Sequence, residues 1–303
     1  ARATARILNV YRPNVTINDI QTAILQFYAY YRDDFDFVQV VFALPSWPAN
    51  RYHGMVRNDV GGIGAASLNV GASFGSAAKL KGYTVFPIDT LFDCGESAFS
   101  HELGHQWINF LKNPSLAAGT PHWPPSTMAR GIMGLSIPGQ GAGGDFPYKI
   151  EMVNSTTAHV TSSTVTQEFS DFDLYLMGFL PASAVAPGIV IQGNGCADCM
   201  VPASPITIAD VTAANGPRIP NSTLSQRSFR VGTVIVSRDR LLNDEEMAMF
   251  EYFAARGEAS QILPYSSGLV RGTTKPFFVA TRGLGSVDLR LELPPPRRRS
   301  ARH

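Results

Sequence analysis

The chain has 303 residues, of which 45% are hydrophobic and 16% charged, so it can bury a sizeable core and is not expected to be disordered. Its net charge of +1 becomes −3 once the four arginines among its last seven residues are set aside, which gives no reason to expect a nucleic-acid partner. The sequence has no run of 18 apolar residues, so no membrane span is expected.

Helical and strand patterns alternate in the first third of the chain. Apolar residues at helical spacing predict a helix within 17–32, and the β-branched and aromatic run 35–44 predicts a buried strand that ends at Pro45. Residues 61–76 are rich in Gly, Ala and Ser and predict tight strands or turns, because no helix or ribose-binding acid follows to support a dinucleotide-binding loop. A short strand is expected over 81–88.

An amphipathic helix is predicted over 97–111, and Asn113-Pro114 should end it. The next 55 or so residues are rich in loops, with short β pieces expected near 148–153 and 157–166. Further on, the patterns predict a helix over 169–180 capped by Ser170, a strand over 227–236, a helix over 243–256 capped by Asn243, and closing strands over 277–281 and 287–293. These elements predict an α+β fold with a long helix set among strands.

We expect a single catalytic domain of two lobes, the first over 1–112 and the second over 113–293, followed by a basic Pro/Arg tail over 294–303. With neither an initiator Met nor a signal segment, the chain is expected to be a mature form or an excised domain. Cys196 and Cys199 predict a local disulfide rather than half of a metal knuckle, because no second C-x-x-C is present.

Residues 101–105, His-Glu-Leu-Gly-His, match the H-E-x-x-H pattern. Positions i and i+4 share one helix face, so His101 and His105 can bind one zinc ion. Zinc lowers the pKa of its water to about 7, and Glu102 is placed to remove that proton without being a ligand. Gly104 should cost roughly 1 kcal/mol relative to Ala inside a helix, so we expect another segment to approach closely behind the histidines.

A catalytic zinc ion needs a third protein ligand and keeps one open position. The short metzincin pattern fails, because Ile108 and Leu111 stand where its Gly and His should be. Asp173 is the first choice for the third ligand, since a second helix brings an acid to the histidine pair in gluzincins. The usual acid there is Glu, so Asp173 would be a variant with a shorter side chain.

His122 is the rival for the third zinc ligand. If it is not a ligand, we expect it to be catalytic, stabilising the oxyanion of a tetrahedral intermediate. Asp171 and Glu168 are further, less favoured candidates for the ligand position.

Four segments together resemble a group of bacterial extracellular zincin-like domains: HELGHQW at 101–107, HW at 122–123, IMG at 132–134 and FSDFDLYLMGFLP at 169–181. The likeness extends from about 52 to 190, and the weaker FFVATRGLGSVDL carries it toward the C-terminus. Phe172 stands where the group usually has Leu, which removes no candidate ligand. The resemblance implies a gluzincin-like zincin fold, with a mixed sheet and two ligand-bearing helices, and a metallopeptidase activity.

The expected function is that of a secreted, monomeric zinc metalloendopeptidase acting on a protein or peptide substrate, with Glu102 as general base. One alternative is a zincin-shaped binding or adhesion module whose metal is structural, which a closed four-ligand site would favour. Another is a metal-dependent hydrolase acting on a non-peptide amide, since the chemistry of water activation would be the same.

Overall fold

The computed structural model describes residues 1–16, 19–44, 51–116, 122–130, 132–134, 148–163, 168–193, 195–262 and 276–291. Within 88–104 the side chains at 89, 90 and 92–97 are outside this description. The predicted end of a strand at Pro45 and the basic tail at 294–303 also lie outside the described residues. Among the described residues, no helix is both long and apolar enough to cross a membrane.

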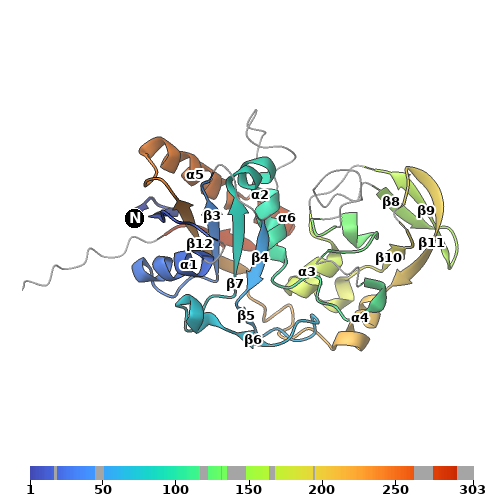
Figure 1. Ribbon diagram of the computed structural model, residues 1–303. Coiled ribbons are helices and arrows are strands. Elements are labelled where there is room, and N and C mark those ends of the chain that lie inside the picture. Colours follow the sequence, from blue (N-terminus) through green and yellow to red (C-terminus); the bar gives the residue numbers. More distant parts are fainter. Residues whose placement is uncertain are drawn as a thin grey trace, which may run out of the picture.

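A seven-stranded mixed sheet forms the larger part of the molecule (Figure 1). Its strand order is β1-β2-β12-β3-β7-β4, with β13 also paired to β12. The strands are β1 (Arg2–Ala3), β2 (Ile7–Tyr11), β3 (Phe37–Phe42), β4 (Tyr52–Met55), β7 (Gly82–Pro87), β12 (Ser228–Ser237) and β13 (Ser286–Asp288). β2, β12, β3 and β7 run parallel, whereas β1 and β4 are antiparallel to their neighbours at the two edges.

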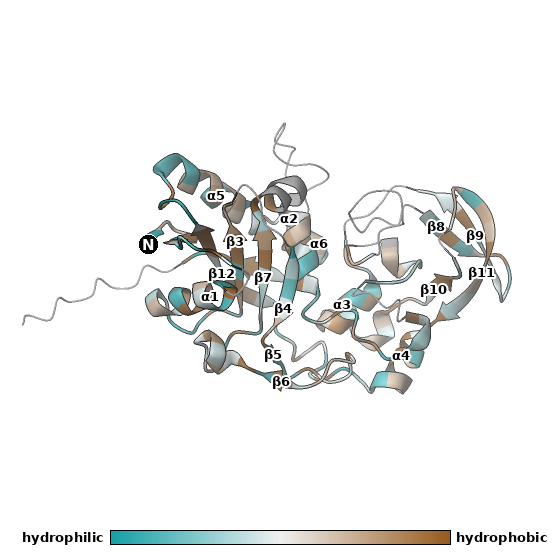
Figure 2. Ribbon diagram, viewed as in Figure 1, coloured by the Kyte–Doolittle hydropathy of each residue, from teal (hydrophilic) through white to brown (hydrophobic). Residues whose placement is uncertain are grey.

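Helices cover both faces of this sheet. α1 (Asp19–Tyr30) packs through Ile24 and Phe27 on one face, and α2 (Ile88–Gly104) and α5 (Asp244–Gly257) lie against the other. In β3, Val38 and Val40 join the α1 side while Phe37 and Val41 join the α2 side. A strand buried on both faces reads as a nearly continuous apolar run, as the strand predicted at 35–44 does. The central strands of the sheet are largely coloured as hydrophobic in Figure 2.

A smaller, antiparallel sheet lies beyond the C-terminal end of α2 (Figure 1). Its order is β10-β11-β9-β8, from β8 (Tyr148–Met152), β9 (Thr157–Ser162), β10 (Gly188–Ile191) and β11 (Asp198–Ile206). The remaining elements are α3 (Asp171–Met177), α4 (Ile208–Asn215), α6 (Phe277–Ala280), the short pair β5 (Arg57–Asn58) and β6 (Leu68–Asn69), and the 3-10 turns η1 (Gly71–Phe74), η2 (Pro114–Leu116), η3 (Met128–Arg130) and η4 (Ala182–Ala184). One hydrophobic cluster joins the α2 face of the large sheet to α3 and the small sheet.

The predicted helix caps are confirmed. Ser170 caps α3 and Asn243 caps α5. In each case the cap side chain accepts the backbone N–H of the residue three positions later. The side chain of that later residue in turn accepts the backbone N–H of the cap residue. This reciprocal pair satisfies two backbone donors that the first helical turn leaves free. Residues 61–76 form the predicted tight strands and turns, through β6 and η1.

The large sheet crosses the predicted lobe boundary. The first lobe was expected to end at 112, yet β12 lies in the middle of the large sheet, between β2 and β3. α5 packs against the same sheet, and β13 pairs with β12. The described elements β12, α5 and β13 therefore lie with the sheet built from the first 112 residues, on the other side of the boundary expected at 112.

The strand predicted over 277–281 is wrong, because these residues form helix α6. The N–H groups of Ala280 and Thr281 donate to the carbonyls of Pro276 and Phe277, four residues back. Phe277 is fully buried against the rings of Phe169, Phe179 and Phe229. A short apolar run fits a buried turn of helix as well as a strand, so periodicity alone does not separate them.

Helix α2 begins and ends earlier than predicted, at Ile88 and Gly104 rather than over 97–111. After Gly104 the N–H groups of His105, Gln106 and Trp107 donate to carbonyls three residues back. Asn109 then has a φ of 77°, in the left-handed region. This tightening ends the helix, although Trp107 and Ile108 remain buried as their apolar pattern predicts.

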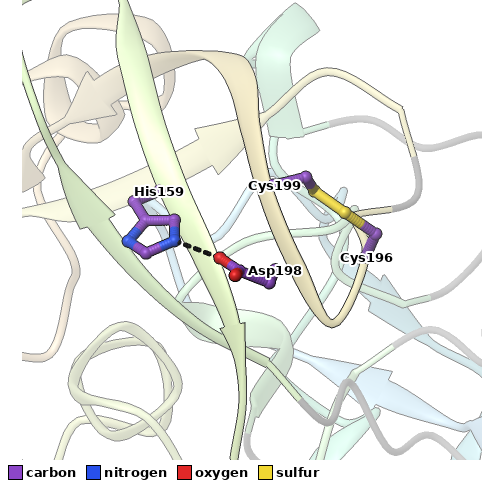
Figure 3. Close-up of a disulfide and its surroundings, with 4 residues drawn as sticks. All are labelled: His159, Cys196, Asp198 and Cys199. Carbon is purple, nitrogen blue, oxygen red and sulfur yellow. Dashed lines mark hydrogen bonds and ion pairs between the residues drawn. A yellow bond between two sulfur atoms is a disulfide. The ribbon is translucent and has the colours of Figure 1, made fainter.

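Cys196 and Cys199 form the predicted disulfide, at the start of β11 (Figure 3). Beside it, His159 of β9 lies with Nε2 2.6 Å from Oδ1 of the exposed Asp198. The third cysteine, Cys94, lies in the part of α2 whose side chains are not described.

Candidate metal centre

Three histidines converge at the C-terminal end of α2. His101 lies in the last turn of the helix, and His105 directly follows its final residue with a right-handed helical backbone. His122 lies between η2 and η3 in the sequence. One ring nitrogen from each residue lies within 4.8 Å of the others. The Nε2 atom of His101 is 3.2 Å from that of His105 and 3.1 Å from that of His122.

These spacings fit a metal ion held by three imidazoles. With zinc–nitrogen distances of about 2.0–2.1 Å, two ligands of a tetrahedral site lie about 3.3 Å apart. Each neutral imidazole has one N–H donor and one acceptor nitrogen, so three ring nitrogens this close together cannot all be satisfied by hydrogen bonds to one another. A metal ion can accept the lone pairs of all three. The three nitrogens found among the described residues therefore fit a zinc-like cation.

The histidines are held neutral, as metal ligands must be. The backbone carbonyl of Ile132 lies 2.6 Å from Nδ1 of His101, so Nδ1 carries the proton and the lone pair of Nε2 is free. Burial lowers the pKa of His101 to about 3, with the charge of His122 as a further cause. Burial also lowers the pKa of His105 and His122.

Glu102 lies beside this group, almost completely buried. Its Oε1 is 4.0 Å from Nε2 of His101 and 3.1 Å from Nε of Arg51, which precedes β4. Burial raises the pKa of Glu102 to about 7, while the charge and hydrogen bond of Arg51 act in the opposite direction. A carboxyl group with a pKa near neutrality is suited to accepting and returning a proton.

Asp173, the first choice for the third ligand, is placed differently. The ligand atoms that converge come from the three histidines and not from Asp173. Its Oδ1 accepts the indole N–H of Trp123 at 2.7 Å, and its Oδ2 accepts both the N–H and the hydroxyl of Ser170. Burial raises the pKa of Asp173 to about 6 against these hydrogen bonds. Both oxygens therefore already have partners.

The two less favoured acids also have other partners. Asp171 pairs with Arg282 at 2.8 Å and accepts the N–H of Ala186. Glu168 is 4.0 Å from the same guanidinium. These contacts place both acids at the surface around Arg282.

A close approach behind the histidines, predicted from Gly104, is confirmed. A Cβ at this position would lie 2.8 Å from Sδ of Met133 and 3.0 Å from the ring of Phe169. The carbonyl of Met133 also accepts the N–H of Trp123, next to His122. The segment 132–134 therefore contacts the backbone of α2, the candidate ligand His101 and Trp123, the neighbour of His122.

Replacing Gly104 with Ala should crowd Met133 and Phe169 at a cost of about 1–3 kcal/mol. The gain in helix propensity, about 1 kcal/mol, acts against this cost, so we expect a net destabilisation of up to about 2 kcal/mol. Gly257→Ala at the end of α5 is the matched control, since its nearest contact would be an ordinary 3.6 Å. Urea unfolding of both variants measures the difference, and equal stabilities would contradict the close contact.

The sequence pattern did not identify Arg51 or the carbonyl of Ile132, because neither has a fixed spacing from the H-E-x-x-H pattern. It also did not identify the link between His53 and Gln106, whose side-chain atoms lie 2.9 Å apart. Gln106 donates in turn to the carbonyl of Arg57 at 2.8 Å, which ties the turn after α2 to the chain beyond β4. For the contacts of His122 and Trp123, the signal in the sequence was that the two residues are adjacent.

Comparison with known proteins found no family model that matches the chain. Neither the curated proteins nor the solved structures contain a match to it. The function must therefore be inferred from the geometry of the site itself.

Proposed function

We propose that this protein is a zinc-dependent metallopeptidase of zincin fold, with His101, His105 and His122 as its metal ligands. The observation that carries the proposal is the convergence of these three imidazoles beside a buried glutamate that follows the first of them on the same helix. The mixed sheet supports the fold, because its antiparallel edge strand β4 packs beside α2. His122 thus replaces Asp173 in the ligand set expected from the sequence.

The chain's own groups have distinct tasks in this proposal. A zinc ion held there would supply Lewis acidity and lower the pKa of a coordinated water to about 7. Glu102 accepts a proton from the attacking water and passes it to the leaving amine. Arg51, with Nε 3.1 Å from Oε1 of Glu102, places a permanent positive charge beside the proposed general base.

The proposed substrate is a protein or peptide, and the proposed location is outside the cell. The disulfide Cys196–Cys199 supports the location, because disulfides persist in oxidising compartments. Among the described residues three side chains converge as candidate ligands. Three protein ligands support catalysis over a purely structural role for the metal, since structural zinc sites are usually closed by four protein ligands.

Digestion of a proteome-derived peptide library, with and without a chelator, tests this function. We expect new peptide ends that disappear when the metal is removed and return when zinc is restored. If zinc binds but no peptide bond is cut, the alternatives of a binding module or a non-peptide amide hydrolase would be favoured. Hydrolysis that persists in the fully metal-free protein would contradict the proposal.

A further inference from the structure

Trp123 connects a candidate ligand to a buried carboxylate. Its backbone N–H donates to the carbonyl of Met133 at 3.1 Å, and its indole N–H donates to Oδ1 of Asp173 at 2.7 Å. Trp123 and Asp173 are both 0% exposed. Main chain and side chain of Trp123 are therefore both held, directly after His122 in the sequence.

Capping α3 does not account for the burial of Asp173. Asp210 has the same capping role at the start of α4, where it forms the same kind of capping box with Thr207. Asp210 is exposed to solvent, whereas Asp173 is buried. A buried carboxylate is unfavourable unless its oxygens are satisfied, so the burial of Asp173 needs a second role.

The additional contact of Asp173 is the indole of Trp123. The carboxylate makes a hydrogen bond to a neutral donor, which is stronger than a bond between two neutral groups. Such a bond, shielded from water, restricts the rotation of the indole and the backbone that carries it. Hydrogen bonds outside the ligand set orient metal ligands, and this one would act on His122 through the backbone of its neighbour Trp123.

We propose that Asp173 is a positioning residue that fixes His122 for metal binding through its hydrogen bond to the indole of Trp123. This inference rests on the proposed function, because it takes His122 to be a ligand. It assigns the helix motif SDFDLYLMG a role in the metal site without making Asp173 a ligand. α3 is then linked to the metal site by one hydrogen bond, from the indole N–H of Trp123 to Asp173.

Zinc affinity of the purified full chain, measured by competition with a chromophoric chelator, tests the inference. Trp123→Phe removes the indole N–H donor together with part of a fully buried ring, and leaves the cap of α3 in place. Asp173→Asn removes the carboxylate, and Asp210→Asn is its matched control because it alters the same capping box at α4. We expect zinc binding to weaken about 10–100-fold in the first two variants and to stay unchanged in Asp210→Asn.

The visible absorption of the Co²⁺-substituted protein provides a readout that capping alone would not move. We expect altered bands in Trp123→Phe and Asp173→Asn and an unmodified spectrum in Asp210→Asn. If Asp173→Asn does not fold, Trp123→Phe decides alone. Unmodified zinc affinity and spectrum in Trp123→Phe would overturn the inference while leaving the ligand set intact. An unmodified protein that binds no zinc would instead contradict the proposed function, and the inference with it.

Discussion

Replacing Glu102 with Gln is expected to lower peptide hydrolysis by about 10²–10⁴-fold and to leave the zinc content unchanged. The amide has nearly the shape of the carboxylate but cannot accept the proton. Oε1 of Glu102 is 4.0 Å from Nε2 of His101, and the carboxylate does not belong to the converging group of ligand atoms. Its charge is therefore not needed to hold the metal. Single-turnover kinetics and metal analysis on the same preparation measure the two effects separately.

Glu151→Gln on β8 is the matched control, because it makes the same chemical change at an exposed site. It should retain full activity. Full activity in Glu102→Gln would show that Glu102 is not the base. Loss of zinc from that variant would show that Glu102 takes part in binding the metal, which would contradict the roles proposed above.

Replacing His122 with Ala should weaken zinc binding by more than the 10–100-fold expected for a residue outside the ligand set. The reason is that one of three converging nitrogens is lost, and its Nε2 lies only 3.1 Å from that of His101. Peptide hydrolysis should fall with it at limiting zinc. Equilibrium competition with a chelator measures the change.

His159→Ala is the matched control, because this histidine lies on β9, partly exposed and paired with Asp198 (Figure 3). Its zinc affinity should equal that of the unmodified protein. Near-normal affinity in His122→Ala, together with complete loss of binding in Asp173→Ala, would restore Asp173 as the third ligand and contradict the histidine set.

Local features of this fold could be predicted from the sequence. Ser170 and Asn243 were recognisable as caps because capping depends on a few neighbouring residues. The buried strand β3 was recognisable from its apolar run, and the disulfide from the spacing of its cysteines. The contact behind Gly104 could be expected because Gly within a helix needs a reason.

The long-range arrangement was beyond the sequence. Nothing in the run 227–236 says that β12 pairs between β2 and β3, because the partners of a strand are set by topology. The third ligand posed the same difficulty. Asp173 had the right residue type on a helix, but its oxygens are bound by Trp123 and Ser170, and only the structure shows those contacts.

A crystal structure of the zinc-loaded protein, with anomalous data collected on both sides of the zinc absorption edge, tests the metal site most directly. We predict one zinc peak about 2.0–2.1 Å from the Nε2 atoms of His101, His105 and His122, with Asp173 still bound to the indole of Trp123. A zinc ion coordinated by the carboxylate of Asp173 in place of His122, or no zinc at the three histidines, would contradict the account.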